Sequence, residues 1–193
     1  MKFEDFVERK REKLLKSLKS FGLQVEFVGE AQFRKLFDKY YKKVFSGYPS
    51  SHYLPSPQEL KKGEQMASRY AQLHTDFLIL RDKKGNYLGH FTGETDDKRT
   101  FYLRNAGILP AIRNKKIATK FVTAYLEYLK QLGYSRVTSQ HKCTNNAVLI
   151  MMLKLGFHIQ GLEIREEWGT LVKCVYYLEP KRKQVFTRMT NGS

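Results

Sequence analysis

Residues 108–118 read ILPAIRNKKIA and join two segments of different character. Residues 101–109 form a strand-like run that ends at Pro110. Good helix formers extend from residue 116 to residue 132, and Gly133 ends the helix. The pattern predicts a strand, a turn and a helix N-terminus. The first N–H groups of a helix lack partners within it and lie at the positive end of its dipole. We therefore expect an anion-binding site at this turn, with added charge from Arg113, Lys115 and Lys116.

The same turn resembles the acetyl-CoA-binding signature of the Gcn5-related N-acetyltransferase (GNAT) family. That signature has an aliphatic residue, a Pro, an Arg or Gln, and then Gly-x-Gly or Gly-x-Ala at the start of a helix. The matching residues are Ile108, Pro110, Arg113 and Ala118. Lys116 stands where the family usually has the first Gly. Because Gly lets a backbone approach a phosphate closely, the Lys116 side chain has to turn away, although a lysine can also pair with phosphate.

A second motif lies at residues 145–157, NNAVLIMMLKLGF. It resembles the later motif of the same family, in which an Asn opens a short helix that closes with Lys-Leu-Gly-Phe and enters a strand. Thr144 or Asn145 can cap the first turn, and Gly156 suits the left-handed position after the last turn. Many family members have a Tyr in this helix that protonates the departing sulfur, and Met152 occupies that position here.

The composition is that of one well-packed domain with a basic surface. The 193 residues are 41% hydrophobic and 13% aromatic, so Phe and Tyr can supply much of the core volume. The formal net charge of +16 favours an acidic partner, such as a phosphorylated cofactor, a nucleic acid, a ribosome or an acidic protein. The two cysteines, Cys143 and Cys174, suggest neither a zinc site nor a disulfide framework. We expect Cys143 to be a small buried thiol rather than an acyl-enzyme nucleophile.

The rest of the chain predicts helices and strands around the two motifs. We expect residues 1–22 to form an amphipathic helix packed on the domain, residues 23–180 a GNAT-like acetyltransferase domain, and residues 181–193 a loose basic tail. Besides the motif helices, helices are predicted at 30–45 and 56–73, and strands at 23–28, 77–81, 87–94, from about 99, 136–141, 157–164 and 170–178. The order predicts an α/β fold with a mixed, mostly antiparallel, twisted sheet of about seven strands and flanking helices, which is the topology of the GNAT family.

The resemblance implies how acetyl-CoA is held. Backbone amides of residues 113–119 hold the pyrophosphate, and the strand at residues 106–108 pairs with the pantetheine arm beside Asn145. An N–H of Ile108 or Leu109 polarises the thioester carbonyl, and a β-bulge is expected at residues 105–107. The residues implied in cofactor binding are Gly107, Ile108, Leu109, Arg113, Asn114, Lys115, Lys116, Ile117, Ala118, Thr119 and Asn145.

The sequence offers three candidates for proton transfer. Arg104 and Asn105, just before the expected bulge, cannot serve as a base. The remaining catalytic candidates are Glu94 and His90 on the third strand and His141 at the end of the fifth. Strand alternation predicts that one face carries Leu88, His90, Thr92 and Glu94.

Two classes of function follow. The first is an acetyl-CoA-dependent N-acetyltransferase that acts on a primary amine by direct attack in a ternary complex. Its acceptor is a small molecule or a protein, with Tyr48, His52 and Tyr53 as candidate contacts in a loop. The second is a catalytically weak or inactive acyl-CoA-fold module that binds nucleic acid or a ribosome through its basic surface, which the charge and Met152 favour.

The sequence also bears on partners and location. An acidic or nucleic-acid-associated partner fits both classes of function, and a homodimer is left open. Residues 1–20 mix acids and bases without a continuous apolar core, so they resemble neither a secretory signal nor a membrane span. We expect a cytoplasmic protein with no metal site.

Overall fold

The computed structural model describes residues 3–45, 74–97 and 99–191. The predicted helix at 56–73 and the loop residues Tyr48, His52 and Tyr53 lie outside these ranges. In chain order the elements are α1 (Phe3–Ser20), β1 (Gln24–Phe27), α2 (Glu30–Val44), β2 (Thr75–Arg81), β3 (Tyr87–Asp97), β4 (Thr100–Ile108), the 3-10 turn η2 (Pro110–Ile112), α4 (Ile117–Gln131), β5 (Arg136–Lys142), α5 (Asn146–Lys154), β6 (His158–Arg165), β7 (Gly169–Tyr177) and α6 (Pro180–Asn191).

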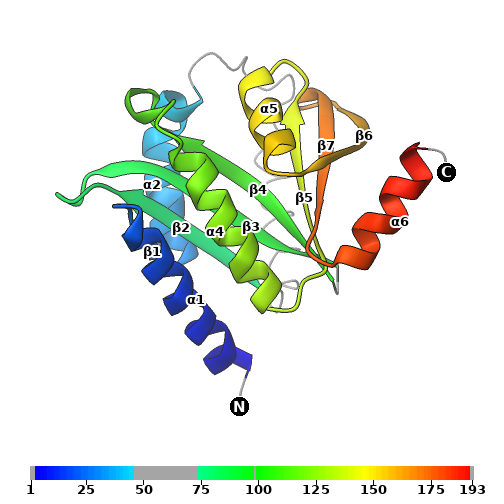
Figure 1. Ribbon diagram of the computed structural model, residues 1–193. Coiled ribbons are helices and arrows are strands. Elements are labelled where there is room, and N and C mark those ends of the chain that lie inside the picture. Colours follow the sequence, from blue (N-terminus) through cyan, green and yellow to red (C-terminus); the bar gives the residue numbers. More distant parts are fainter. Residues whose placement is uncertain (1–2, 46–73, 98, 192–193) are drawn as a thin grey trace, which may run out of the picture.

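The strands of the described chain form one seven-stranded sheet in the order β1-β2-β3-β4-β5-β7-β6. Neighbouring strands are antiparallel except β4 and β5, which are parallel. A parallel pair needs a crossover, and α4 supplies it. The predicted mixed, mostly antiparallel sheet with flanking helices is therefore confirmed, and Figure 1 shows its twist.

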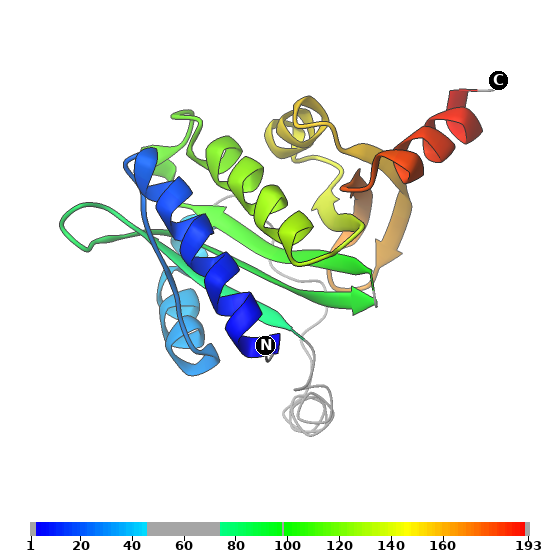
Figure 2. The same cartoon turned by 60° about the horizontal axis from the view of Figure 1, so that its bottom comes forward.

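Helices cover both faces of the sheet. On one side, which we call the α4 face, α1 and α4 lie next to each other (Figure 2). Residues such as Leu78, Phe101 and Val137 form the main core with them. On the other side, the α2 face, α2 packs through Phe33 on Ile79 of β2. The α5 helix also belongs to the α4 face, because its buried Met152 is part of the main core and its partly buried Val148 and Leu149 pack against that core.

The N-terminal amphipathic helix is present as α1 and is bound by both apolar and ionic contacts. Val7, Leu14 and Leu18 are buried. From the same helix, Arg11 reaches the buried Asp76 of β2 at 2.7 Å. Phe21, which the helical pattern assigns to the apolar face, is instead 41% exposed. No helix in the described part of the chain combines the length and the apolar character needed to cross a bilayer.

Four local predictions need correction. Residues 180–191 form the helix α6 rather than a loose tail, and Cys143 is exposed rather than buried. In β3, Gly89 pairs with Leu80 but Tyr87 pairs with Arg81. The residue between them, Leu88, is therefore bulged, and it packs in the core of the α4 face rather than beside His90. The β-bulge expected at residues 105–107 of β4 lies instead at Arg104.

Candidate active site

The predicted anion-binding turn lies between η2 and α4. In η2, the Arg113 N–H donates to the Pro110 carbonyl at 3.1 Å, and the first bond of α4 runs from the Lys120 N–H to the Lys116 carbonyl at 3.0 Å. Between these bonds, the backbone N–H groups of residues 114–119 have no acceptor within the described chain. The turn therefore presents a row of free donors at the positive end of the α4 dipole, as an anion site requires.

Two residues of this turn have a left-handed backbone. Asn114 has φ 62°, and Lys116, the residue before α4, has φ 57° and ψ 15°. Asn tolerates this conformation, whereas a lysine in it costs about 1 kcal/mol. Lys116 thus adopts a backbone conformation that glycine would take without strain, and its side chain is exposed.

We expect Lys116→Gly to raise the free energy of unfolding by about 0.5–1 kcal/mol, because glycine adopts this conformation without strain. Urea denaturation checks the value. Lys116→Ala is the matched control, since it removes the same charge but keeps the Cβ. A glycine variant less stable than the alanine variant would contradict the explanation that the Lys116 backbone is strained.

The C-terminus of α2 packs under the turn. The Arg113 side chain contacts both α2 and β4: Nη2 donates to the Val44 carbonyl, and Nε donates to the Ile108 carbonyl at 3.4 Å. The backbone N–H of Arg113 is bonded as well, so Arg113 fastens the turn to α2, and its Nε and Nη2 already donate to protein carbonyls. The same helix end lies against Gly107, where an added Cβ would overlap the Val44 side chain.

Next to the turn, β4 and β5 separate. Their parallel pairing runs from Thr100 with Arg136 to Leu103 with Ser139 and then stops, although both strands continue. Residues 104–108 of β4 and 140–142 of β5 therefore diverge on the two sides of an opening, which we call the fork. The fork includes residues 105–107, where a β-bulge was expected.

Backbone groups of β4 point into the fork at alternate residues. The Leu109 N–H donates to the Leu88 carbonyl of β3 at 2.8 Å. In an antiparallel ladder the groups of Gly107 then also point to β3, whereas those of Ala106 and Ile108 point to the opposite side, into the fork. Of the two predicted donors, the Ile108 N–H points into the fork, whereas the Leu109 N–H is bonded to β3.

A β-bulge opens β4 at the base of the fork. Thr92 of β3 pairs with Asn105, but the next residue of β3 pairs with Leu103, which leaves Arg104 as the extra residue. The bulge therefore lies just before the predicted range, 105–107.

His90 is enclosed on the α2 face. It has no exposed surface, and its ring lies 4.9 Å from that of Phe37 and 5.6 Å from that of Phe33. Its Nδ1 is hydrogen-bonded to the Tyr87 hydroxyl at 2.5 Å. Burial lowers the pKa of His90 to about 4, so the ring is neutral at neutral pH. These contacts give His90 a place in the packing beneath α2, without access to a substrate.

Glu94 lies further along the same face and is partly exposed. Its Oε1 accepts hydrogen bonds from Nε of Arg104, at 2.9 Å, and from Nη2 of the same residue. Its Oε2 has no donor within the described residues. On the next strand, Tyr102 pairs with Glu94 and donates its hydroxyl to Oε1 of Gln140 at 3.1 Å. Polar side chains thus cross from β3 to β5 at the base of the fork.

His141 lies on the opposite side, the α4 face. It alternates on β5 with Val137 and Ser139, and its Nε2 is 3.0 Å from the Ser139 Oγ. Ser139 is 1% exposed, and burial lowers the pKa of His141 to about 4. The structure therefore separates His141 from Glu94 by the sheet instead of gathering the candidates in one cluster. Sequence reasoning missed Ser139, although its position two residues before His141 on a strand was a usable signal.

The α5 helix begins where the second motif predicts. Asn145 is its N-cap, with a side chain that accepts from the Val148 N–H at 3.4 Å, and Gly156 follows the helix with φ 93°. Met152 is 2% exposed and packs in the core of the α4 face. The position that holds a Tyr in many relatives thus supplies no hydroxyl here.

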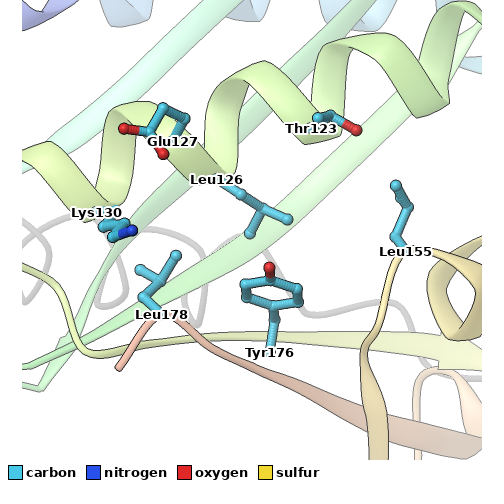
Figure 3. Close-up of a pocket in the computed structure, with 7 residues that line it drawn as sticks. All are labelled: Thr123, Leu126, Glu127, Lys130, Leu155, Tyr176 and Leu178. Carbon is cyan, nitrogen blue, oxygen red and sulfur yellow. The ribbon is translucent and has the colours of Figure 1, made fainter. Parts of the chain in front are cut away.

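A separate hollow of about 250 Å³ lies between α4, Leu155 and the end of β7. Figure 3 shows the Tyr176 ring standing toward Leu126 of α4, with Thr123 at one end and Lys130 at the other. Thr123 is six residues into α4, roughly 9 Å along the helix from the anion-binding turn. We therefore treat the turn and the fork, rather than this hollow, as the candidate site.

Comparison with known proteins agrees with this geometry. The sequence model of the Acetyltransferase (GNAT) family matches residues 32–157, and the chain therefore belongs to the GNAT acetyltransferase family. No curated protein matches the chain.

Solved structures of acetyltransferases share the fold. The putative acetyltransferase yncA from Salmonella typhimurium, solved with acetyl-CoA, has a TM-score of 0.58 and 13% identity over 81% of this chain and 94% of its own. The spermidine/spermine N-acetyltransferase SpeG from Vibrio cholerae has a TM-score of 0.57 and 12% identity over 89% and 97%. The phosphinothricin acetyltransferase Pat from Sinorhizobium meliloti, solved with acetyl-CoA, has a TM-score of 0.58 and 15% identity over 82% and 89%.

Proposed function

We propose that this protein transfers an acetyl group from acetyl-CoA to the primary amine of a small-molecule or protein acceptor. The observation that carries the proposal is that two features adjoin: the free N–H groups of residues 114–119, and the fork, whose β4 edge presents the backbone groups of Ala106 and the N–H of Ile108. The turn suits a phosphate group, and the fork suits an extended arm with amide groups. Both belong to the matched family region.

The residues present fit coenzyme A. Ala106 is exposed at the fork and carries only a methyl group, so the β4 edge can be approached closely. Lys115 and Lys116 are exposed at the turn and add positive charge beside the free N–H groups. Bound acetyl-CoA would supply the acetyl group as a thioester. The Ile108 N–H would then donate to the carbonyl oxygen, where negative charge develops during the transfer.

The proton lost by the amine needs an acceptor. Among the predicted candidates, Glu94 is accessible and keeps one carboxylate oxygen without a donor in the described chain, while Arg104 holds the other. We propose Glu94, directly or through water, as that acceptor. His90 is left out because it has no exposed surface.

The names of the structural neighbours suggest acceptors to test. SpeG is a spermidine/spermine N-acetyltransferase and Pat a phosphinothricin acetyltransferase, so polyamines and small amines belong in a first panel. The basic surface of this chain favours acidic or nucleic-acid-associated proteins, whose lysine-containing peptides belong there as well.

Calorimetric titration of acetyl-CoA into the purified protein tests the cofactor site. We expect micromolar binding by wild type, a loss of at least tenfold in Lys115→Ala/Lys116→Ala, and little change in Lys130→Ala, which removes charge at the other end of α4. Thiol release with the amine panel then identifies the acceptor. No binding up to millimolar acetyl-CoA would overturn the proposal. Salt-sensitive RNA binding without cofactor binding would support the alternative, a nucleic-acid or ribosome-binding module.

A further inference from the structure

The proposed reaction calls for a hydrogen-bond donor to the departing sulfur, and the second motif does not supply one. Acetyl transfer from a thioester releases a sulfur that carries the electron pair of the broken C–S bond. Met152 is buried and apolar, so α5 offers no hydrogen-bond donor from the position where many relatives have a Tyr. A donor to the sulfur has to come from another residue on the same face.

The Ser139 and His141 pair meets the requirements of position. Ser139 is the last residue of β5 that pairs with β4, and His141 is two residues further, where β5 borders the fork. Both side chains lie on the α4 face, the face to which α5 belongs. Their polar atoms are 3.0 Å apart.

The surroundings keep the pair neutral. Opposite His141 on β7 lies Val172, and opposite Ser139 lies Cys174, whose pKa burial raises, so it remains a thiol. Burial also lowers the pKa of His141 to about 4. A neutral imidazole has one N–H, and its second nitrogen must accept. If the Ser139 hydroxyl donates to Nε2, the proton of the ring lies on Nδ1 and is available to a ligand.

We propose that His141, held in this tautomer by Ser139, donates a hydrogen bond from Nδ1 to the departing sulfur and so replaces the missing phenol. The lone pair of the amine forms the new C–N bond, the C–S bond pair leaves on sulfur, and the proton of the amine goes to the base or to solvent. No proton needs to leave His141, because a thiol has a pKa near 8.5 and its anion is a tolerable leaving group. His141 is thus a catalytic residue and Ser139 a positioning residue. This inference rests on the proposed function.

The test is the pKa of the thiol of bound coenzyme A, measured by the ultraviolet absorbance of its thiolate as the pH is raised. Protein loaded with desulfo-CoA serves as the blank, which removes the signals of Cys143 and of the tyrosines. A donor to the thiolate stabilises it, so we expect wild type to lower this pKa by about one unit relative to free coenzyme A. The measurement needs no acceptor.

Four variants separate the roles. We expect His141→Val to abolish the lowering, His141→Gln to keep part of it through its amide N–H, and Ser139→Ala to reduce it. Thr138→Val is the matched control: Thr138 is buried on the same strand but faces the other side, and its hydroxyl has no partner in the described chain. It should leave the thiol pKa unchanged, and the same order should appear in kcat once an acceptor is known.

The outcomes distinguish the two proposals. If wild type binds coenzyme A but lowers its thiol pKa no more than His141→Val and Ser139→Ala do, the role of the pair is overturned and the proposed function stands. If wild type does not bind coenzyme A, the proposed function fails and this inference fails with it.

Discussion

Replacing Asp76 with alanine is expected to lower the free energy of unfolding by about 3–4 kcal/mol, because it leaves buried partners without their anion. Asp76 has no exposed surface. Its Oδ1 accepts from Arg11 at 2.7 Å and lies 3.1 Å from Nε2 of His74, and its Oδ2 accepts the Tyr125 hydroxyl at 3.0 Å. One carboxylate thus joins α1, β2 and α4.

Urea denaturation of the variant measures the loss, and Asp76→Asn is the matched control. Asparagine keeps the shape and one acceptor oxygen but removes the charge, so we expect a smaller loss of about 1–2 kcal/mol. A loss below 1 kcal/mol in Asp76→Ala would show that the network contributes little beyond its packing.

The same carboxylate gives the stability of the protein a defined pH dependence. Burial alone would raise the pKa of Asp76, but the hydrogen bond from His74 and the charges of His74 and Arg11 outweigh burial and hold this pKa below its ordinary value of 3.8. A depressed pKa in the folded state adds stability above pH 4, and that stability is lost as the pH falls through the folded pKa. Between pH 4 and pH 2 wild type should therefore lose more stability than Asp76→Asn.

The turn and its helix could be predicted because their signals are local. Pro110, the helix formers from residue 116 and Gly133 each act on their own neighbours, and the structure begins and ends α4 within about a residue of the prediction. The short connection between the strands predicted at 77–81 and 87–94 is local in the same way, since Asp82 accepts hydrogen bonds from the backbone of Lys84 and Asn86.

The roles of individual side chains were harder to predict, because they depend on contacts between distant segments. The motif predicts that Arg113 binds phosphate, yet its side chain donates a hydrogen bond to the carbonyl of Val44, 69 residues earlier in the chain. His90 and Glu94 lie on the same face, as strand alternation predicts. Only the packing of α2 shows that His90 is enclosed and Glu94 accessible. The bulge at Arg104 depends on how β3 pairs with β4, and no local residue marks it.

The importance of Asp76 also comes from a distant contact, although the sequence carried a hint. An acid in the apolar run TDFLILR alternates with Leu78 and Leu80, so it faces the core, where an unpaired carboxylate is costly. That pattern predicts a buried partner. It does not identify the partner as Arg11 of α1, 65 residues earlier in the chain.

Gly107→Ala is expected to lower the free energy of unfolding by about 2–3 kcal/mol and to weaken acetyl-CoA binding. A Cβ at residue 107 would overlap Cγ1 of Val44, so either α2 or β4 has to move. Neither can move alone, since Arg113 fastens the end of α2 to the turn that follows β4. The edge of β4 that borders the fork should therefore shift, and the predicted cofactor grip with it.

A second substitution can test whether the overlap is the cause. Val44→Ala removes the atom that a Cβ at residue 107 would meet, so the double variant should lose at least 1 kcal/mol less than the sum of the single losses. Gly161→Ala in β6 is the matched control, because a Cβ there meets no atom within 4 Å. Urea denaturation gives the stabilities, and calorimetric titration gives the affinity for acetyl-CoA. Strictly additive losses would mean that residue 107 needs the backbone freedom of glycine rather than the space that glycine leaves for α2. Arg113 alone would then connect α2 to the fork.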